Sequence, residues 1–290
     1  MKKYIFFISI LFSLIIIPVV INNIKNYNQN LFSFKIKVIN RIKNNTFQRC
    51  NIKILKKIPQ DSSLIVGHAY GSNNKQVKEV LINKKLEKLL NNNKEKINNL
   101  IFSGDVLDSP TSDKWKKLYN SYKNINVHIS PGNHDIGVNE KRLLNLFKNS
   151  DFYKKSFPYL LNAEGFNLII EDSISSEWKI SKEVVNLIKL TNTKFPTLLI
   201  RHNIPIRELV YLANSNSGKG NSLPSIKNLN NIFNKKITII SGDSGAFNYL
   251  PRFFCMSKDK IKIILNGIGG ISGDTILVLY RGQLYRYILD

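Results

Sequence analysis

Five short apolar stretches in this chain each end in a residue that can bind a metal ion. They cover residues 64–66, 100–102, 127–129, 198–200 and 237–240. The segments that follow them read Gly67-His68, Gly104-Asp105, Gly132-Asn133-His134-Asp135, Arg201-His202 and Gly242-Asp243. Imidazole, carboxylate and carbonyl groups are the ligands that Mn, Fe and Zn accept in proteins. The pattern therefore indicates metal-assisted chemistry.

Asp and Asn residues after a strand often serve only to make a turn. One or two such tips would predict nothing. Five in order, one of them containing Asn133-His134-Asp135, favour a binding site over turn chemistry. In open α/β sheets, ligand sites form at the carboxyl ends of the strands, and glycines there allow close approach of the backbone.

The elements that must position these residues belong to an α/β domain, because short apolar runs alternate with helical patterns from Ser62 onward. Strands are predicted at 64–66, 100–102, 125–129, 197–200 and 237–240. Helices are predicted where apolar residues recur at helical spacing, over 77–90, 115–122 and 184–188. After Pro251 the pattern is nearly all β, and the Ser/Asn/Gly-rich stretch 213–224 is expected to form a mobile loop.

The order Gly104-Asp105-Val106-Leu107-Asp108, then Gly132-Asn133-His134-Asp135, then His202 resembles the calcineurin-like metallophosphoesterase superfamily. The resemblance covers about residues 62–270, and residues 157–172 are similar to the strand pair that follows the family's Asn-His motif. It implies an α/β fold of two mixed β-sheets sandwiched between helices, with the C-terminal β-rich stretch in the second sheet.

The resemblance also implies a site for one or two divalent ions (Mn, Fe or Zn), bridged by Asp105. The second metal takes Asn133 and His202. Its last ligand in the family is the first His of a Gly-His-x-His motif, which here reads Gly242-Asp243-Ser244-Gly245. Because a carboxylate is an acceptable ligand for these metals, Asp243 replaces the imidazole. By this resemblance the second site is intact.

The first metal site departs from the family pattern. The family begins with Asp-x-His, whereas this chain has His68-Ala69-Tyr70, and Gly245 stands where the last motif has its second His. His68 is expected to substitute for one ligand, and Tyr70 is a poor ligand. The departure leaves three outcomes open: one metal, a rearranged pair, or lost catalysis.

The activity implied is hydrolysis of a phosphate ester, in which a metal at the second site would activate water and polarise the phosphoryl oxygens. By the resemblance, Asp108 holds His134, which protonates the leaving group or stabilises its charge. Three roles stay open for His68: a metal ligand, a general acid or base, or a loop histidine without a role in the site. The substrate stays open among monoesters, diesters, nucleotides and lipid-linked sugar phosphates.

Four other residues near these motifs receive lesser roles. Arg201 is a candidate phosphate clamp, unless the alternation of the strand points it elsewhere. His128 lies inside a strand pattern and is expected to be a packed or surface residue. Asp135 is expected to support its loop, and Asp172 to be structural or to support the site from outside it.

A non-catalytic membrane-anchored module that keeps the fold is the rival interpretation. The altered first site favours it, whereas Asp108 and His134 favour the enzyme because neither is needed for folding. A net charge of +23 suggests an anionic partner. The lysines, however, are spread along the chain among Asn and Ile without an arginine-rich patch, so no nucleic-acid partner is expected.

The N-terminus predicts a membrane anchor over residues 1–21. Lys2 and Lys3 precede an uncharged apolar run, residues 4–21, whose length of about 27 Å as a helix just spans a bilayer core. The run ends without a small-x-small cleavage site, which favours an uncleaved anchor over a signal peptide. A short basic N-terminus usually stays inside, so the domain is expected to lie outside the cytoplasm.

Residues 22–60 are polar and basic and are interpreted as a stalk, followed by the metallophosphoesterase-like domain at 61–290. Cys50 and Cys255 are too few and too far apart to indicate a disulfide framework or a zinc site, and Cys255 is expected to be a buried strand residue.

Overall fold

The computed structural model describes residues 48–71, 81–153, 156–213, 222–246, 253–269 and 273–289. The chain divides into two compact units, Met1–Phe47 and Gln48–Asp290, and the fold described below is that of the second. The apolar run predicted to be a membrane anchor lies outside the described residues. Within the part of the chain that the structure describes, no helix has the length and apolar character needed to cross a bilayer.

One of the two β-sheets has five strands in the order β12-β11-β2-β3-β4. Its strands are β2 (Ser62–Val66), β3 (Ile97–Phe102), β4 (Asn126–Ile129), β11 (Thr275–Tyr280) and β12 (Gln283–Ile288). The three early strands run parallel to one another, and β11 pairs antiparallel with both β2 and β12. The carboxyl ends of β2, β3 and β4 therefore meet at one edge.

The other sheet has seven strands in the order β1-β9-β10-β8-β7-β6-β5. The bounds are β1 (Gln48–Arg49), β5 (Tyr159–Ala163), β6 (Phe166–Ile170), β7 (Thr197–Arg201), β8 (Ile237–Ser241), β9 (Phe253–Lys258) and β10 (Ile261–Asn266). Strands β6, β7, β8 and β10 are parallel, while β5 and β9 pair antiparallel with their neighbours. Both sheets are mixed, as the resemblance implies.

A shared apolar core joins the two sheets. Ile65 of β2 and Leu277 of β11 belong to the same buried cluster as Leu168 of β6 and Ile200 of β7. Because successive residues of a strand point to opposite faces, the neighbouring Leu64 instead faces the helices that cover the five-stranded sheet. Both faces of the inner strands are buried, and nearly all of their residues are therefore apolar.

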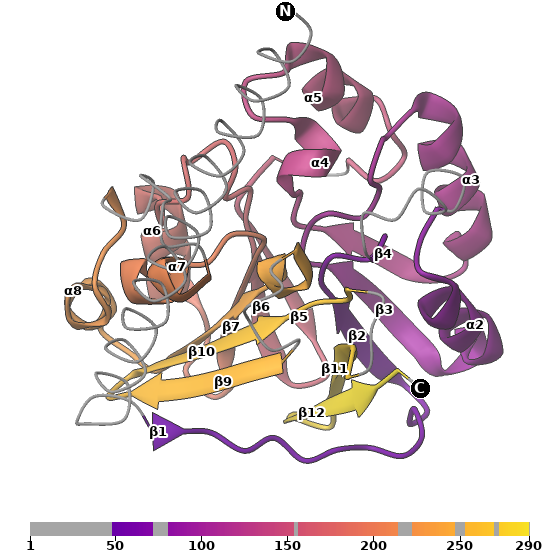
Figure 1. Cartoon of the computed structure of the whole chain (residues 1–290). Helices are drawn as coiled ribbons and strands as arrows, with labels where there is room; N and C mark the ends of the chain where they lie inside the picture. Colours follow the sequence, from indigo (N-terminus) through magenta and orange to yellow (C-terminus); the bar gives the residue numbers. More distant parts are fainter. Residues whose placement is uncertain are drawn as a thin grey trace, which may run out of the picture. The chain divides into compact units, whose positions relative to one another are not determined.

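Helices cover the outer faces of the sheets (Figure 1). Leu86 of α2 (Lys84–Asn92) and Trp115 of α3 (Ser112–Tyr122) pack with the outer face of the five-stranded sheet. On the other sheet, α6 (Lys182–Leu190) contacts β6, and α8 (Ile226–Ile232) contacts β10. The remaining helical segments are η2 (Lys94–Lys96), α4 (Asn133–Ile136), α5 (Lys141–Lys148), α7 (Arg207–Ala213) and η4 (Asp243–Ala246).

The predicted strands all form, and the predicted helices at 115–122 and 184–188 correspond to α3 and α6. The helix predicted over 77–90 begins only at Lys84, because the side chain of Asn83 caps it by accepting hydrogen bonds from Lys85 N and Leu86 N. The first residues of that prediction, 77–80, lie outside the described residues, as does most of the predicted loop 213–224.

A disulfide bond joins Cys50 to Cys255, which lies in β9 and is buried. The bond was not predicted from the sequence, because 205 residues separate the two cysteines along the chain. The bond can form because β1 pairs antiparallel with β9, which brings Cys50, the residue after β1, beside Cys255. Residues 50–58, assigned above to the stalk, also bond to the domain through Leu55 N and Arg286 O at 2.9 Å.

Candidate metal centre

The predicted strand tips converge from both sheets. His68 N donates to Gly104 O at 3.0 Å, which ties the tip of β2 to that of β3. In the other sheet, Gly242 N donates to Arg201 O at 3.1 Å, and Ser241 Oγ donates to His202 O at 2.7 Å. These bonds align the neighbouring strand ends within each sheet. The side chains that follow the strands lie together in one small volume.

The imidazole of His202 lies at the centre of this volume. Its Nε2 is 3.2 Å from Asn133 Oδ1, 3.5 Å from Asp105 Oδ1 and 3.5 Å from Asp243 Oδ1. The ligand atoms of Asp105, His202 and Asp243 all lie within 4.8 Å of one another, and all three residues are buried. Four residues predicted from separate strand tips are thus brought together.

This donor set fits a divalent cation. One nitrogen with at most one proton cannot satisfy three oxygen acceptors, so the cluster needs positive charge. Two ligands that each lie about 2.1 Å from a metal are about 3.0–3.4 Å apart at octahedral or tetrahedral angles. The distances of 3.2 and 3.5 Å around His202 Nε2 are close to that range.

His68 lies on the other side of the Asp105 carboxylate. Its Nε2 is 3.7 Å from Asp105 Oδ2, and its Nδ1 is 2.9 Å from Ile268 O. A carbonyl oxygen only accepts, so Nδ1 carries the proton and the neutral ring has its lone pair on Nε2. Nε2 is buried and has no hydrogen-bond partner among the described residues. A histidine that donates its other ring N–H to a backbone carbonyl is typical of a metal ligand.

His134 lies where the cluster is partly open to solvent. Its side chain is 32% exposed, and its Nδ1 is 3.0 Å from the backbone oxygen of Asp108 and 3.6 Å from the carboxylate Oδ1 of the same residue. The backbone N–H of His134 donates to Asp105 Oδ1 at 3.1 Å. The predicted Asp108–His134 pair therefore exists, but the shorter contact is made by the backbone carbonyl of Asp108.

Two glycines allow this close assembly. A Cβ atom on Gly104 would overlap the His202 ring, and Gly104 has a φ of 89°. A Cβ atom on Gly132 would overlap the Asp105 carboxylate and its backbone nitrogen. Any larger residue at either position would displace a candidate ligand.

The electrostatics of the cluster reflect buried negative charge. Burial raises the pKa of Asp243 to about 7. Burial also acts to raise the pKa of Asp105, but the neighbouring His202 and His68 outweigh it and leave that pKa lowered. For His202 burial acts to lower the pKa, yet Asp105 and Asp243 outweigh it and raise the pKa. The two carboxyl groups thus shift in opposite directions, because burial dominates at Asp243 and the neighbouring histidines dominate at Asp105.

The family model for calcineurin-like phosphoesterases matches residues 79–274 of this chain. The chain belongs to this family. Its members use divalent metals, and the cluster around His202 supplies suitable ligands in this chain.

A curated relative from Arcobacter nitrofigilis, named a probable glycerophosphodiester phosphodiesterase, is 30% identical over 128 residues, which cover 41% of this chain. The match spans 46% of the length of that relative. Among solved structures, a purple acid phosphatase from yellow lupin seeds has a TM-score of 0.47 at 10% identity, over 80% of this chain and 55% of that one. Phosphopantetheinyl hydrolase from Mycobacterium tuberculosis has a TM-score of 0.41 at 12% identity, over 73% and 91%.

Asp135, Asp172 and His128 lie near the candidate site without joining its cluster of ligands. Asp135 supports its loop, since its carboxylate accepts from Val106 N at 3.0 Å and from Gly132 N at 2.9 Å. Asp172 is structural, because it accepts from the backbone of the turn that follows it. His128 is a partly buried strand residue whose Nδ1 lies 3.2 Å from Tyr159 Oη.

Arg201 is not the phosphate clamp that its position suggested. It is fully buried, its Nη1 lies 3.1 Å from Glu171 Oε1, and its Nη2 donates to the backbone oxygen of Trp178. Its neighbour Ile200 points into the core between the sheets, so strand alternation turns Arg201 to the opposite face. Burial outweighs the attraction of Arg201 and raises the pKa of Glu171 to about 7. Sequence reasoning missed this pair, because nothing local marks Glu171 as its partner.

Proposed function

We propose that this phosphoesterase hydrolyses phosphate esters with a divalent metal held by Asp105, Asn133, His202 and Asp243. The observation that carries the proposal is the position of His202 Nε2, which faces oxygen atoms of the other three residues within 3.5 Å. A simple structural cluster would pair its donors and acceptors, whereas this one gathers acceptors around a single nitrogen.

We assign His68 to the same centre as a further ligand. The hydrogen bond from Nδ1 to Ile268 O leaves Nε2 with a lone pair that could bind a metal. This Nε2 faces Oδ2 of Asp105. Because the two oxygens of Asp105 face different histidines, the carboxylate is placed to bridge two positions. This geometry supports the ligand role of His68 over the acid–base role.

A metal bound by these residues would supply a water of lowered pKa and polarise the phosphoryl oxygens. His134 is the proposed proton donor to the leaving group, because it is the partly exposed imidazole of the site. The backbone carbonyl of Asp108 accepts from Nδ1, so the proton given to the leaving group is the second proton of the protonated ring, carried on Nε2.

Metal content and activity of the full-length protein, measured together, test the proposal. We expect Mn, Fe or Zn by elemental analysis and hydrolysis of bis(p-nitrophenyl) phosphate or p-nitrophenyl phosphate. The diester is included because the Arcobacter relative carries the name of a phosphodiesterase. Bound metal without hydrolysis of either ester would support the rival interpretation, a non-catalytic module that keeps the fold. A protein that binds none of these metals contradicts the proposal itself.

We further propose that residues 1–21 anchor the protein in a membrane and that the phosphoesterase domain lies outside the cytoplasm. The disulfide between Cys50 and Cys255 supports this placement, because such bonds persist in oxidising compartments and are rare in the cytosol. Carbonate extraction of membranes and protease treatment of intact cells test the two parts. Release into the carbonate supernatant would contradict the anchor, and full protection from protease would contradict the orientation.

A further inference from the structure

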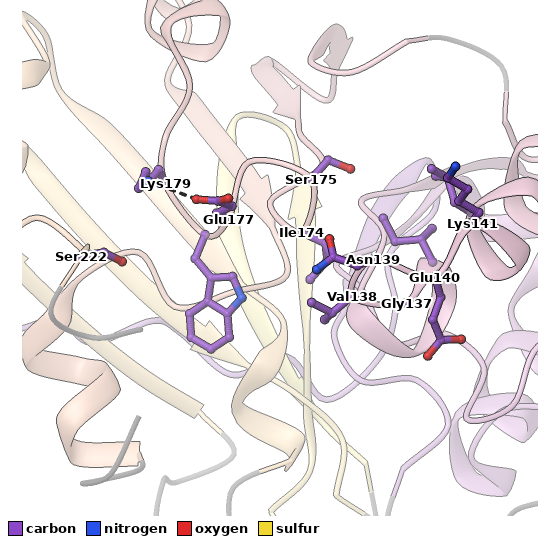
Figure 2. A pocket seen from close by; sticks show the side chains of 13 residues that line it. Gly137, Val138, Asn139, Glu140, Lys141, Ile174, Ser175, Glu177, Lys179 and Ser222 are labelled. Carbon is purple, nitrogen blue, oxygen red and sulfur yellow. Dashed lines mark hydrogen bonds and ion pairs between the residues drawn. The ribbon is translucent and has the colours of Figure 1, made fainter. Parts of the chain in front are cut away.

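A cavity of about 700 Å³ lies between residues 136–144 and residues 174–179. Its apolar lining comes from Ile136, Val138, Leu144, Ile174 and Trp178. Figure 2 shows residues 137–141 on one side of it and Glu177 and Lys179 on the other. We refer to it as the Trp178 cavity.

The first wall of the Trp178 cavity continues from the metal centre. Helix α4 begins at Asn133, which contacts His202, and ends at Ile136, which lines the cavity. Residues three apart lie on the same side of a helix, with Cβ atoms about 5–6 Å from each other. The cavity therefore begins about one helical turn from the Asn133 side chain.

The second wall is also tied to the centre. Ser173, next to Ile174, bonds the side chain of Asn203 through its hydroxyl at 2.9 Å and accepts from Asn203 N at 3.1 Å. Asn203 follows His202 directly. One wall therefore continues from Asn133, and the other is bonded to Asn203, the neighbour of His202.

Trp178 is held in an unusual backbone conformation on this wall. Its φ is 71°, a value that bulky residues rarely adopt. Two hydrogen bonds maintain it: Trp178 N donates to Ser173 O at 2.8 Å, and the buried Arg201 donates to Trp178 O. Since Arg201 precedes His202, the same strand tip that carries a candidate ligand also fixes the indole-bearing residue.

The charges around the Trp178 cavity cancel. Two lysines and two glutamates line it, namely Lys141, Lys179, Glu140 and Glu177. Lys179 and Glu177 neutralise each other at 3.2 Å. In a chain with a net charge of +23, a lining without net charge does not favour a second phosphate or another anion. An indole among aliphatic side chains instead suits a flat, uncharged aromatic group.

We infer that the Trp178 cavity binds an uncharged aromatic group of the ester substrate and so selects aryl or nucleoside phosphodiesters. The inference rests on the proposed hydrolysis at the neighbouring metal centre. An ester whose phosphate is held at that centre would have its organic group beside the Trp178 cavity, whose lining begins at Ile136, one helical turn from Asn133. Stacking on an aromatic side chain accounts for about a tenfold or larger gain in binding.

Three diesters with a common leaving group test this inference: the ethyl, octyl and phenyl esters of p-nitrophenyl phosphate. We expect the full-length protein to hydrolyse the phenyl ester with a kcat/KM about tenfold above that of the ethyl ester, mainly through KM. Trp178→Ala should abolish the preference and Trp178→Phe should retain part of it. Phe195→Ala is the matched control, because Phe195 is exposed at the amino-terminal end of β7.

Equal kcat/KM for phenyl and ethyl esters, a higher value for the octyl ester, or a preference that survives Trp178→Ala would overturn the aromatic assignment. Binding is measured independently by titrating the full-length protein, as purified with its metal, with phenylphosphonate and ethylphosphonate while following tryptophan fluorescence. Quenching by phenylphosphonate alone, lost in Trp178→Phe, supports the cavity even if no ester is hydrolysed, a result that would refute only the proposed function. No difference between the two phosphonates refutes the cavity inference.

Discussion

Nε2 of His202 lies 3.2 Å from Oδ1 of Asn133, although 69 residues separate them and they follow strands of different sheets. His202 follows β7 of the seven-stranded sheet, and Asn133 follows β4 of the five-stranded sheet. A cation held by both residues would therefore connect the two layers of the domain.

Metal binding should stabilise the fold for this reason. A ligand at a hundred times its Kd that binds only the folded state raises the free energy of unfolding by about 2.7 kcal/mol. We expect Mn or Zn to raise the Tm of chelator-treated protein, and Asp105→Ala to abolish both the rise and the bound metal. Asp113→Ala, which removes an exposed carboxylate of α3, serves as the control and should behave as the wild type. An equal Tm shift in Asp105→Ala would contradict the ligand assignment.

Substitution of His68 distinguishes its two possible roles. As a ligand, His68→Asp should keep or raise metal affinity and retain activity, because a carboxylate replaces the imidazole. The backbone accepts the change, since His68 has a φ of 52° and Asp tolerates that region. His68→Leu should lower metal affinity. Unchanged metal content in both variants, with a lost limb of the pH–rate profile, would instead identify an acid or base.

His134→Ala should slow hydrolysis without changing metal content. Loss of a general acid costs about 10²–10⁴ in rate, and the cost is largest for poor leaving groups that need the proton. Comparing phenyl phosphate with p-nitrophenyl phosphate gives the measurement. Asp108→Asn should cost much less than His134→Ala, because the closer contact to Nδ1 is the backbone carbonyl of residue 108. Equal losses for the two esters would remove the proton-donor role.

The Glu171–Arg201 pair predicts a pH dependence of stability. Burial raises the pKa of Glu171 to about 7, above the value of about 4.3 for an unfolded chain. A carboxyl with a raised pKa holds its proton more tightly in the folded state, so its contribution to stability falls as pH rises from about 4.3 to about 7. Glu171→Gln removes this contribution, which is on the order of 3–4 kcal/mol.

The measurement is urea unfolding of wild type and Glu171→Gln at pH 5 and pH 8. The wild type should lose more stability over this interval than the variant, because other titrating groups such as Asp243 are common to both. Glu177→Gln is the control, since the Glu177 side chain is 81% exposed. Parallel losses in all three proteins would show that Glu171 does not change its protonation state between pH 5 and pH 8, which contradicts the raised pKa.

Removing the disulfide should destabilise the domain. Replacing both Cys50 and Cys255 by Ala is expected to lower the free energy of unfolding by about 2–4 kcal/mol, since the bond closes a long loop of the unfolded chain. Thermal unfolding of wild type with and without reductant should reproduce the loss, and reductant should not affect the double variant. A reductant effect of equal size in the double variant would assign it to something other than this bond.

The residue pattern alone identified the strands, the order of the motifs and the tips that carry Asp105, Asn133, His202 and Asp243. These predictions rest on local rules: a strand buried on both faces is continuously apolar, and parallel strands present their carboxyl ends at one edge. The flanking glycines were equally informative, since Gly104 and Gly132 permit approaches that a Cβ would block.

Tertiary structure decided which atoms meet. The Cys50–Cys255 bond, the inward turn of Arg201 toward Glu171 and the Nδ1 hydrogen bond of His68 to Ile268 each join residues far apart in sequence. The His68–Ile268 bond spans 200 residues. Periodicity assigns a side chain to a face of its own strand, but its partner depends on how two sheets and their helices pack. For this reason the Trp178 cavity, formed where the segment of α4 and α5 meets residues 174–179, had no signal in the sequence.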